Sequence, residues 1–300
     1  MPISIRRLAQ SFVAEITGID LRQPLDDATF GAVRDAFHEH GVLVFRNQDV
    51  DDDQQIAFSR RFGPLETSLT MDRHGGVDRP EMTNLSNVDA DGNLYPPGTR
   101  SVIYSRGNQA WHTDSSFKPV PANGSILSGR TVPPPGVGGE TEFADAAAAY
   151  DALPEARKAM LEGLVAVHWI VESRRRLIGD MLLQNEKQGL PAVRQTVVRT
   201  HPVTGRKAIY AGSHASWIEG WPKEKGFRLL RELTTFATRP EFVYTHAWQP
   251  KDIVMWDNRR VLHRGRPWQE GQHARVMRRT TLAGDGPTVA GDPMAQPDAA

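Results

Sequence analysis

Two histidines and an aspartate are the residues of this sequence best suited to hold a metal ion. His112 and Asp114 are separated by a single residue, and side chains at positions i and i+2 of an extended segment leave the same face. An imidazole and a carboxylate would then converge and supply two of the three ligands of a facial triad, which leaves other coordination positions open. An ordinary polar strand is the alternative interpretation of this tripeptide taken alone.

A second histidine far along the chain is the candidate third ligand. His263 follows the segment Asp252–Trp256, whose apolar residues predict a strand. Strands that are remote in sequence lie side by side in a β-barrel, so such a histidine can reach His112 and Asp114. A half-buried histidine that is hydrogen-bonded to the backbone is the alternative for His263 considered alone.

Two arginines near the C-terminus are candidates for binding anions. On a strand predicted from Arg275 to Leu282, residues Arg275, Met277 and Arg279 share one face. Burying two arginines beside an apolar residue is costly unless each meets an anion. The planar guanidinium can bind a carboxylate through two parallel hydrogen bonds. A solvated edge strand with a basic face is the alternative.

The composition narrows the class of partner. The 300 residues are 39% hydrophobic and 24% charged, and Lys plus Arg equal Asp plus Glu at 36 each. A chain without net charge has no general electrostatic field to attract nucleic acid or an acidic membrane, so a small molecule is the favoured partner.

The absence of cysteine excludes disulfides, thiolate metal sites and cysteine nucleophiles. No signal peptide and no apolar stretch of roughly 20 residues is present, so we expect a cytoplasmic protein without a membrane span.

The elements that position these residues begin with alternating helix and strand signals. A helix is predicted from Asp26 to its stop at Gly41, followed by the buried strand Val42–Phe45. A second short helix is expected over Asp51–Phe62. From Glu66 to Asn108 no periodicity is visible, which predicts a long loop, either an active-site cover or a surface excursion.

Strands separated by turns dominate the sequence after Trp111. Strands are expected at Leu164–Val171, Val197–Thr200, Lys207–Tyr210, Phe242–Trp248 and Arg275–Leu282, and helices after Asp145 and at Lys223–Thr238. No internal repeat or dividing linker is present, so we expect a single domain over residues 1–284. Residues 285–300 are rich in Gly, Pro, Ala and Asp and are expected to form a disordered tail.

The motifs together resemble those of the taurine/2,4-dichlorophenoxyacetate dioxygenase family. The resemblance rests on His112-x-Asp114, Gly138-Gly139-Glu140-Thr141, Trp256-Asp257-Asn258-Arg259 with His263, and Arg275 with Arg279. Their order and spacing match, and the resemblance extends from Ile3 to about Gly284. It implies a mainly β (α+β) fold with a double-stranded β-helix, or jelly roll, as its core and helices on its flanks.

The resemblance also implies the cofactors and the residues that hold them. His112, Asp114 and His263 match the ligands of Fe(II). Thr141 and Arg275 match the pair that holds the distal carboxylate of 2-oxoglutarate. The implied reaction consumes O₂ and 2-oxoglutarate, and ascorbate is the expected activator in vitro.

Fewer residues of the resemblance concern the binding of the substrate. Arg279 matches a second arginine, which faces the acid group of the substrate or the metal-bound end of the cosubstrate, and Asn108 matches a polar residue of the cosubstrate pocket. The segment from His112 to Phe117 resembles the aryloxyalkanoate branch of the family, so Ser115 is expected to contact substrate. Hydroxylation between the ether oxygen and the carboxylate would give a hemiacetal that collapses to a phenol and glyoxylate. The segment Glu66–Asn108 does not align with the family's substrate-contacting residues.

Other functions remain open at this stage. The same chemistry could act on taurine, another alkylsulfonate, an alkyl sulfate or a different small carboxylate. A more distant alternative is a metal-binding barrel that oxidises nothing, or a Zn²⁺ hydrolase, which would need neither 2-oxoglutarate nor a buried arginine beyond the metal. A homo-oligomer is also compatible with the sequence.

Overall fold

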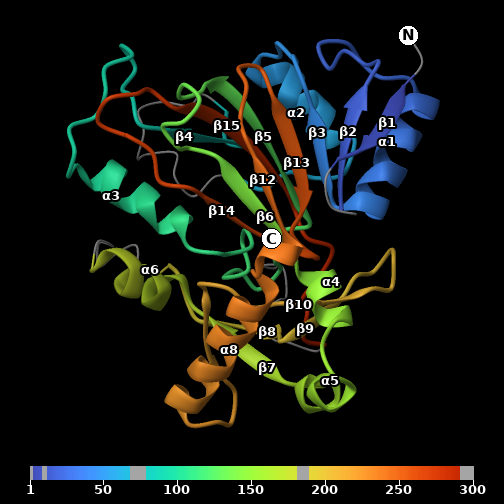
Figure 1. Ribbon diagram of the computed structural model, residues 1–300, viewed down its shortest axis with the longest axis vertical. Coiled ribbons are helices and arrows are strands. Elements are labelled where there is room, and N and C mark those ends of the chain that lie inside the picture. Colours follow the sequence, from blue (N-terminus) through green and yellow to red (C-terminus); the bar gives the residue numbers. More distant parts are fainter. Residues whose placement is uncertain (1–2, 9–11, 68–78, 181–188, 291–300) are drawn as a thin grey trace.

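Two facing β-sheets form the larger half of the molecule (Figure 1). The computed structural model describes residues 3–8, 12–67, 79–180 and 189–290. The first sheet has seven strands in the spatial order β1 (Ser4–Arg7), β2 (Val13–Thr17), β3 (Val42–Phe45), β13 (Ile253–Asp257), β5 (Gly124–Thr131), β15 (Val276–Leu282) and β4 (Met82–Ser86). The second has the order β12 (Val243–His246), β6 (Thr141–Asp145) and β14 (Val261–Gly265). This pair of sheets is the jelly roll expected from the sequence, although hydrogen bonds do not close it into a barrel within the described residues.

The seven-stranded sheet is covered on both faces, as strand β3 illustrates. Successive residues of a strand point to opposite faces. Leu43 and Phe45 pack with helix α1 (Asp27–His40), whereas Val42 and Val44 pack toward the second sheet. All four side chains are fully buried. Burial on both faces explains why this segment is an uninterrupted apolar run rather than an alternating one.

The first two helices begin and end as the sequence predicts. The Asp26 carboxylate caps α1 by accepting from the Thr29 backbone N–H at 2.8 Å. Gly41 ends α1 with φ of 82°, a left-handed conformation that glycine adopts at little cost. Helix α2 (Asp52–Arg60) starts with a reciprocal capping box between Asp51 and Gln54.

Smaller elements fill the lower half of Figure 1. Among the described residues they comprise a three-stranded sheet, a hairpin, four helices and a short 3₁₀ turn. The strands are β11 (Ala215–Ile218), β7 (Val165–His168) and β8 (Val193–Thr196), and β10 (Lys207–Ile209) with β9 (Val198–Thr200); the helices are α4 (Ala146–Asp151), α5 (Glu155–Leu161), α6 (Ile170–Ile178) and α8 (Lys223–Ala237), and the 3₁₀ turn is η2 (Pro240–Phe242). Asp145 caps α4 as expected, by accepting from two backbone N–H groups at 3.1 Å.

Two predicted segments differ from the structure. The stretch Glu66–Asn108 is not a continuous loop, because it contains the edge strand β4, helix α3 (Arg100–Arg106) and the 3₁₀ turn η1 (Gly107–Gln109). Polar residues on these short elements line a cavity, and this removes the apolar periodicity that would have shown them. The strand expected at Leu164–Val171 ends at His168, and the apolar residues beyond it begin α6.

The first six residues of the expected disordered tail lie in the described part of the chain. Residues 285–290 are placed, and Thr288 holds them against β8: its hydroxyl donates to Gln195 Oε1 at 2.6 Å and accepts from the Thr196 N–H at 3.0 Å. For the whole stretch 285–300, disorder stays a prediction. Residues 291–300 lie outside the described part of the chain. No described helix is both long and apolar enough to cross a bilayer.

Candidate active site

A backbone bridge brings together the two histidines that are 151 positions apart in sequence. His112 and His263 exchange two backbone hydrogen bonds, N–H to O distances of 3.0 and 2.8 Å, and their ring centroids lie 4.2 Å apart. The Asp114 carboxylate lies 4.0 Å from His112 Nε2 and 3.6 Å from His263 Nε2. One potential ligand atom from each residue lies within 4.8 Å of the others, and all three residues are buried. The structure thus assembles the trio that the sequence predicts.

The approach of His112 and Asp114 does not follow the predicted extended strand. Only His112 is bridged, and a turn begins at Asp114, where Ser115 has φ of 54°. A left-handed conformation is uncommon for a residue that carries a Cβ. The Ser115 hydroxyl donates to Glu66 at 2.7 Å, and Lys118 donates to the same carboxylate oxygen at 2.7 Å. Ser115 therefore faces Glu66, and the structure does not bring it to the cavity that we expected it to line.

The two imidazoles are prepared to act as metal ligands. His112 Nδ1 lies 2.8 Å from the Ala110 carbonyl oxygen. Because a carbonyl oxygen can only accept a hydrogen bond, Nδ1 carries the hydrogen, and the lone pair of Nε2 is free to bind a metal. Burial lowers the pKa of both His112 and His263, and therefore favours their neutral, ligating forms. Burial alone would raise the pKa of Asp114, but the Arg279 guanidinium and the neighbouring histidines outweigh it and hold that pKa below its usual range.

Hydrogen bonds from neighbouring side chains fix the Asp114 carboxylate. Ser125 donates to Oδ2 at 2.7 Å, and Arg279 donates to Oδ1 at 2.5 Å. Asn258 accepts from the Asp114 backbone N–H at 3.1 Å and donates to the Ser125 hydroxyl at 3.0 Å. Asn258 belongs to the Trp-Asp-Asn-Arg motif, whereas no local signal marks Ser125, which becomes relevant only when β5 lies beside the ligands.

Replacing Asn258 with alanine is expected to lower the free energy of unfolding by about 1–3 kcal/mol, because buried donors lose their acceptor. Asn258 is 1% exposed, and Trp256 Nε1 and Thr113 Oγ1 also donate to its Oδ1. Urea unfolding of the metal-free protein measures the change. Asn93→Ala, in an exposed turn, is the matched control. Equal stability of the two variants would contradict the assigned network.

A second cluster of potential ligands, His38, His201 and Asp257, does not offer the same chemistry. His201 Nδ1 accepts two backbone N–H groups at 3.1 Å, so its Nε2 carries the hydrogen and donates to Asp257 at 2.8 Å. Arg259 donates to both oxygens of Asp257, at 2.8 and 2.7 Å. His201 retains no free lone pair, and its contacts join the β9–β10 turn to the end of β13.

A cavity opens beside the buried trio and contains most of the other predicted site residues. Thr141, Arg275, Arg279 and Asn108 all line it. Its remaining walls come from β4, α3, η1, β14 and the segment around Trp268. The cavity therefore lies between the two sheets, at the end where the bridge between His112 and β14 holds the ligands.

Arg275 gives this cavity the character of an anion site. Its Nε donates to the Gly139 carbonyl at 3.3 Å, and its guanidinium lies 5.4 Å from the centroid of the Trp268 ring. Within the described residues it forms no ion pair, and burial lowers its pKa to about 10, so it stays protonated at neutral pH. A buried cation without a protein counterion can form an ion pair with the carboxylate of a ligand. Asn87, which the sequence did not indicate, accepts from the Arg275 backbone N–H at 2.7 Å and helps to place it.

Asn108 is oriented by a residue outside the cavity. Arg174 of α6 donates to Asn108 Oδ1 at 3.0 Å, so the amide NH₂ group is the part of Asn108 that remains for the cavity. Arg174 also lies 4.6 Å from the Tyr104 ring centroid. Gly107 leaves room for Arg174, because a Cβ at position 107 would lie 1.5 Å from Arg174 Nη1 and would displace the guanidinium.

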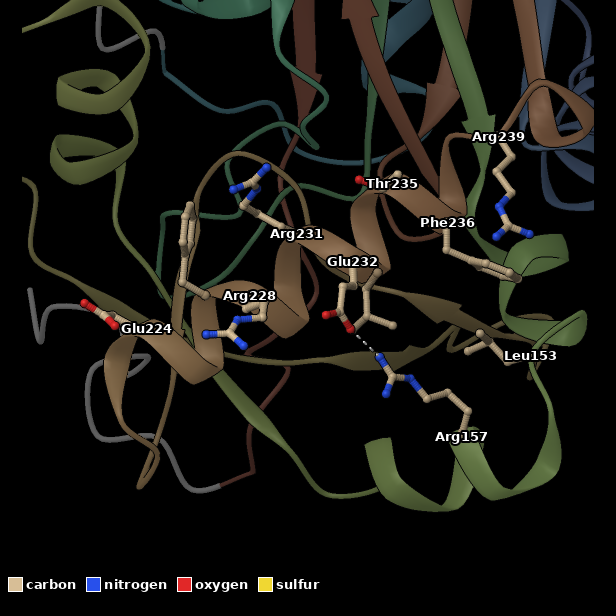
Figure 2. A pocket seen from close by; sticks show the side chains of 11 residues that line it. Leu153, Arg157, Glu224, Arg228, Arg231, Glu232, Thr235, Phe236 and Arg239 are labelled. Atoms are coloured by element: carbon tan, nitrogen blue, oxygen red, sulfur yellow. Dashed lines mark hydrogen bonds and ion pairs between the residues drawn. The ribbon is translucent and has the colours of Figure 1, made fainter.

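A separate hollow lies over the outer face of α8 (Figure 2). Exposed arginines surround it, and Arg157 pairs with Glu232 at 3.1 Å across it. The described residues place no group of three potential metal ligands there. The chemistry suggested by the sequence therefore belongs to the cavity between the sheets.

A jelly roll with two neutral histidines, one ionised aspartate and a buried arginine beside them is the arrangement typical of non-haem metal-dependent oxygenases. The sequence profile described as "Taurine catabolism dioxygenase TauD, TfdA family" matches residues 4–281. The chain belongs to this family, as its motifs indicated.

Known proteins are similar to this chain along nearly its full length. The chain is 43% identical over 285 residues to the alpha-ketoglutarate-dependent 2,4-dichlorophenoxyacetate dioxygenase of Cupriavidus pinatubonensis, covering 94% of this chain and 98% of the relative. It is 39% identical to the (S)-phenoxypropionate/alpha-ketoglutarate-dioxygenase of Sphingobium herbicidovorans, covering 94% and 95%. The crystal structure of AAD-2 in complex with Mn(II) and N-oxalylglycine superposes with a TM-score of 0.88 at 44% identity, covering 96% and 99% of the two chains.

Proposed function

We propose that this protein is an Fe(II)- and 2-oxoglutarate-dependent dioxygenase that hydroxylates an aryloxyalkanoate such as 2,4-dichlorophenoxyacetate. The observation that carries the proposal is the juxtaposition of an open three-ligand cluster with Arg275, a cation that has no protein counterion. A hydrolase would need no such cation. The full-length similarity to dioxygenases that are named for aryloxyalkanoates favours this substrate class.

His112, Asp114 and His263 would hold the metal through two Nε2 atoms and one carboxylate oxygen. The fit rests on the fixed tautomer of His112 and on the convergence of three ligand atoms within 4.8 Å. When bound, Fe(II) with 2-oxoglutarate activates O₂ for C–H hydroxylation, and 2-oxoglutarate leaves as succinate and CO₂.

Arg275 and Thr141 would bind the distal carboxylate of 2-oxoglutarate, and Asn108 would donate its amide hydrogens into the same cavity. Arg279 is placed next to the ligands by its contact with Asp114 and is assigned to the acid group of the substrate. Leu85, whose partner on β15 is Met277, contributes apolar surface to the same cavity. Hydroxylation at the carbon between the ether oxygen and the carboxylate would release a phenol and glyoxylate.

Arg279→Ala is expected to raise the KM for an aryloxyacetate, or to uncouple succinate release from phenol release, while 2-oxoglutarate still binds. Arg275 and Arg279 lie four residues apart on one face, roughly 13 Å along the backbone, so they can serve different anions. Arg279→Lys should restore activity only in part, because an ammonium cannot replace the bidentate fork. Colorimetric phenol detection and anaerobic titration of the Fe(II) charge-transfer absorbance measure the two effects separately. Loss of 2-oxoglutarate binding as severe as in Arg275→Ala would assign both arginines to the cosubstrate.

A substrate panel tests the proposed function directly. Aryloxyacetates, taurine, alkylsulfonates and alkyl sulfates are each incubated with Fe(II), 2-oxoglutarate and O₂, and succinate is measured above the uncoupled background. The expected result is the largest stimulation with an aryloxyacetate. A larger stimulation by a sulfonate or sulfate would reassign the substrate and leave the reaction class intact. No succinate with any compound would contradict the proposal.

The wider organisation of the molecule is part of the proposal. We assign residues 1–284 to one domain, which is supported by the family match over residues 4–281. We place the protein in the cytoplasm, where 2-oxoglutarate is a central metabolite. Light scattering will measure whether it forms a homo-oligomer.

A further inference from the structure

We propose that Trp248 is a positioning residue that fixes the direction of the Thr141 hydroxyl, so that its hydrogen points into the cavity at the carboxylate of 2-oxoglutarate. The inference rests on the function proposed above. It concerns a side chain that does not belong to the cavity lining.

The hydrogen-bond sense follows from the chemistry of the two groups. Trp248 Nε1 lies 2.9 Å from Thr141 Oγ1, and an indole N–H can only donate. Thr141 must therefore accept from Trp248 and keep its own hydrogen. No described residue accepts that hydrogen, although Thr141 is 4% exposed and lines the cavity together with Arg275. The remaining acceptor is a ligand in the cavity.

The orientation matters because the expected ligand is an anion. If a carbonyl stood in the place of Trp248, the hydroxyl would donate to it and would turn a lone pair toward the cavity. A lone pair repels a carboxylate, whereas an O–H donates a charge-assisted hydrogen bond to it. Trp248 thereby makes Thr141 a donor beside the guanidinium of Arg275.

Several contacts hold Trp248 in this position. The His246 ring lies edge-on to it, with centroids 4.6 Å apart and an interplanar angle of 84°. His246 Nε2 pairs with the fully buried Asp252 at 3.1 Å. Asp252 also accepts from the Gln249 N–H at 2.8 Å, which closes the turn that follows Trp248, and it pairs with Arg46.

Gly129 of β5 leaves space for the indole. A Cβ at this position would come within 3.2 Å of Trp248 Cε3 and 2.9 Å of Val132 Cγ1. The neighbouring strand therefore lacks a side chain where the indole packs. Trp248 is built into the sheet interface with a defined orientation, which a positioning role requires.

A double-mutant cycle on ligand binding tests the proposal without turnover. Calorimetry measures the Kd of N-oxalylglycine for the Mn(II)-loaded full chain in the wild type, Trp248→Phe, Thr141→Val and the double variant. Trp248→Phe is expected to raise this Kd by about three- to tenfold, the size of one net hydrogen bond. In the Thr141→Val background the same change should cost less than about twofold. In Thr141→Ser, which keeps the hydroxyl, the full cost should return.

Equal fold-changes in the wild-type and Thr141→Val backgrounds would overturn the proposal, because Trp248 would then act through packing alone. An unchanged Kd in Trp248→Phe would overturn it as well. The Kd of Mn(II) should stay the same in all variants, which separates an effect on the anion site from general damage. Failure of the Mn(II)-loaded wild type to bind N-oxalylglycine would instead contradict the proposed function.

Discussion

Replacing His263 with alanine is expected to abolish turnover and to weaken Fe(II) binding by more than about 100-fold, since loss of a ligand exceeds the 10–100-fold effect of residues that only orient ligands. His263 and His112 supply the two imidazoles of the cluster, and the remaining pair cannot form a facial triad. Anaerobic equilibrium dialysis measures Fe(II) affinity, and thermal unfolding of the metal-free protein shows whether the variant is folded.

The matched control is His38→Ala, which removes a histidine from the second cluster. Because His201 in that cluster uses both ring nitrogens in hydrogen bonds, His38→Ala should retain Fe(II) binding and activity. Near-wild-type activity of a folded His263→Ala variant would show that the metal is held elsewhere. Loss of Fe(II) in His38→Ala alone would assign the metal to the second cluster.

Replacing Arg275 with alanine is expected to weaken 2-oxoglutarate binding by about 2–5 kcal/mol, which corresponds to roughly 30-fold to several-thousand-fold in Kd. The ligand carboxylate would lose the cation assigned to it, in surroundings where burial already lowers the pKa of Arg275 to about 10. Thr141→Val should cost about 1.5–3 kcal/mol, because it removes one hydrogen bond to a charged group. Anaerobic titration of the Fe(II) charge-transfer absorbance measures both.

Arg278, three residues beyond Arg275, provides the control. It lies on the opposite face of β15, where its Nε is 3.8 Å from Asp52. Arg278→Ala should leave the Kd of 2-oxoglutarate within about twofold of the wild type, since surface ion pairs contribute little. Small and equal effects of Arg275→Ala and Thr141→Val would place the anion elsewhere.

The sequence was sufficient for the parts of the site that local patterns encode. The strand before His263 and the alternation of Arg275, Met277 and Arg279 each predict a direction for a side chain, whereas His112 and Asp114 converge through a turn and not through the extended strand that their spacing suggested. The structure places Met277 in the core between the sheets and keeps both arginines at the cavity. Strand β3 and the ends of α1 could also be predicted, because a buried apolar run and a capping aspartate are patterns of a few neighbouring residues.

The rest of the site depends on contacts that no local pattern encodes. Ser125 reaches Asp114 only because β5 lies beside the ligands, and Trp248 reaches Thr141 across two paired strands. Arg174 reaches Asn108 from helix α6, which the sequence analysis did not predict. The hydrogen bond of Ser115 to Glu66 depends on the left-handed turn after Asp114, which the sequence did not indicate.

The most direct test of the central claim is the stoichiometry of one reaction. The purified protein, freed of metal by chelation, is incubated with 2,4-dichlorophenoxyacetate, 2-oxoglutarate and O₂, and succinate and phenol are quantified before and after Fe(II) and ascorbate are added. We predict no product without Fe(II), and close to one succinate per phenol with it. Phenol release without Fe(II), or without consumption of 2-oxoglutarate, would contradict the assignment of this chain as an Fe(II)- and 2-oxoglutarate-dependent dioxygenase.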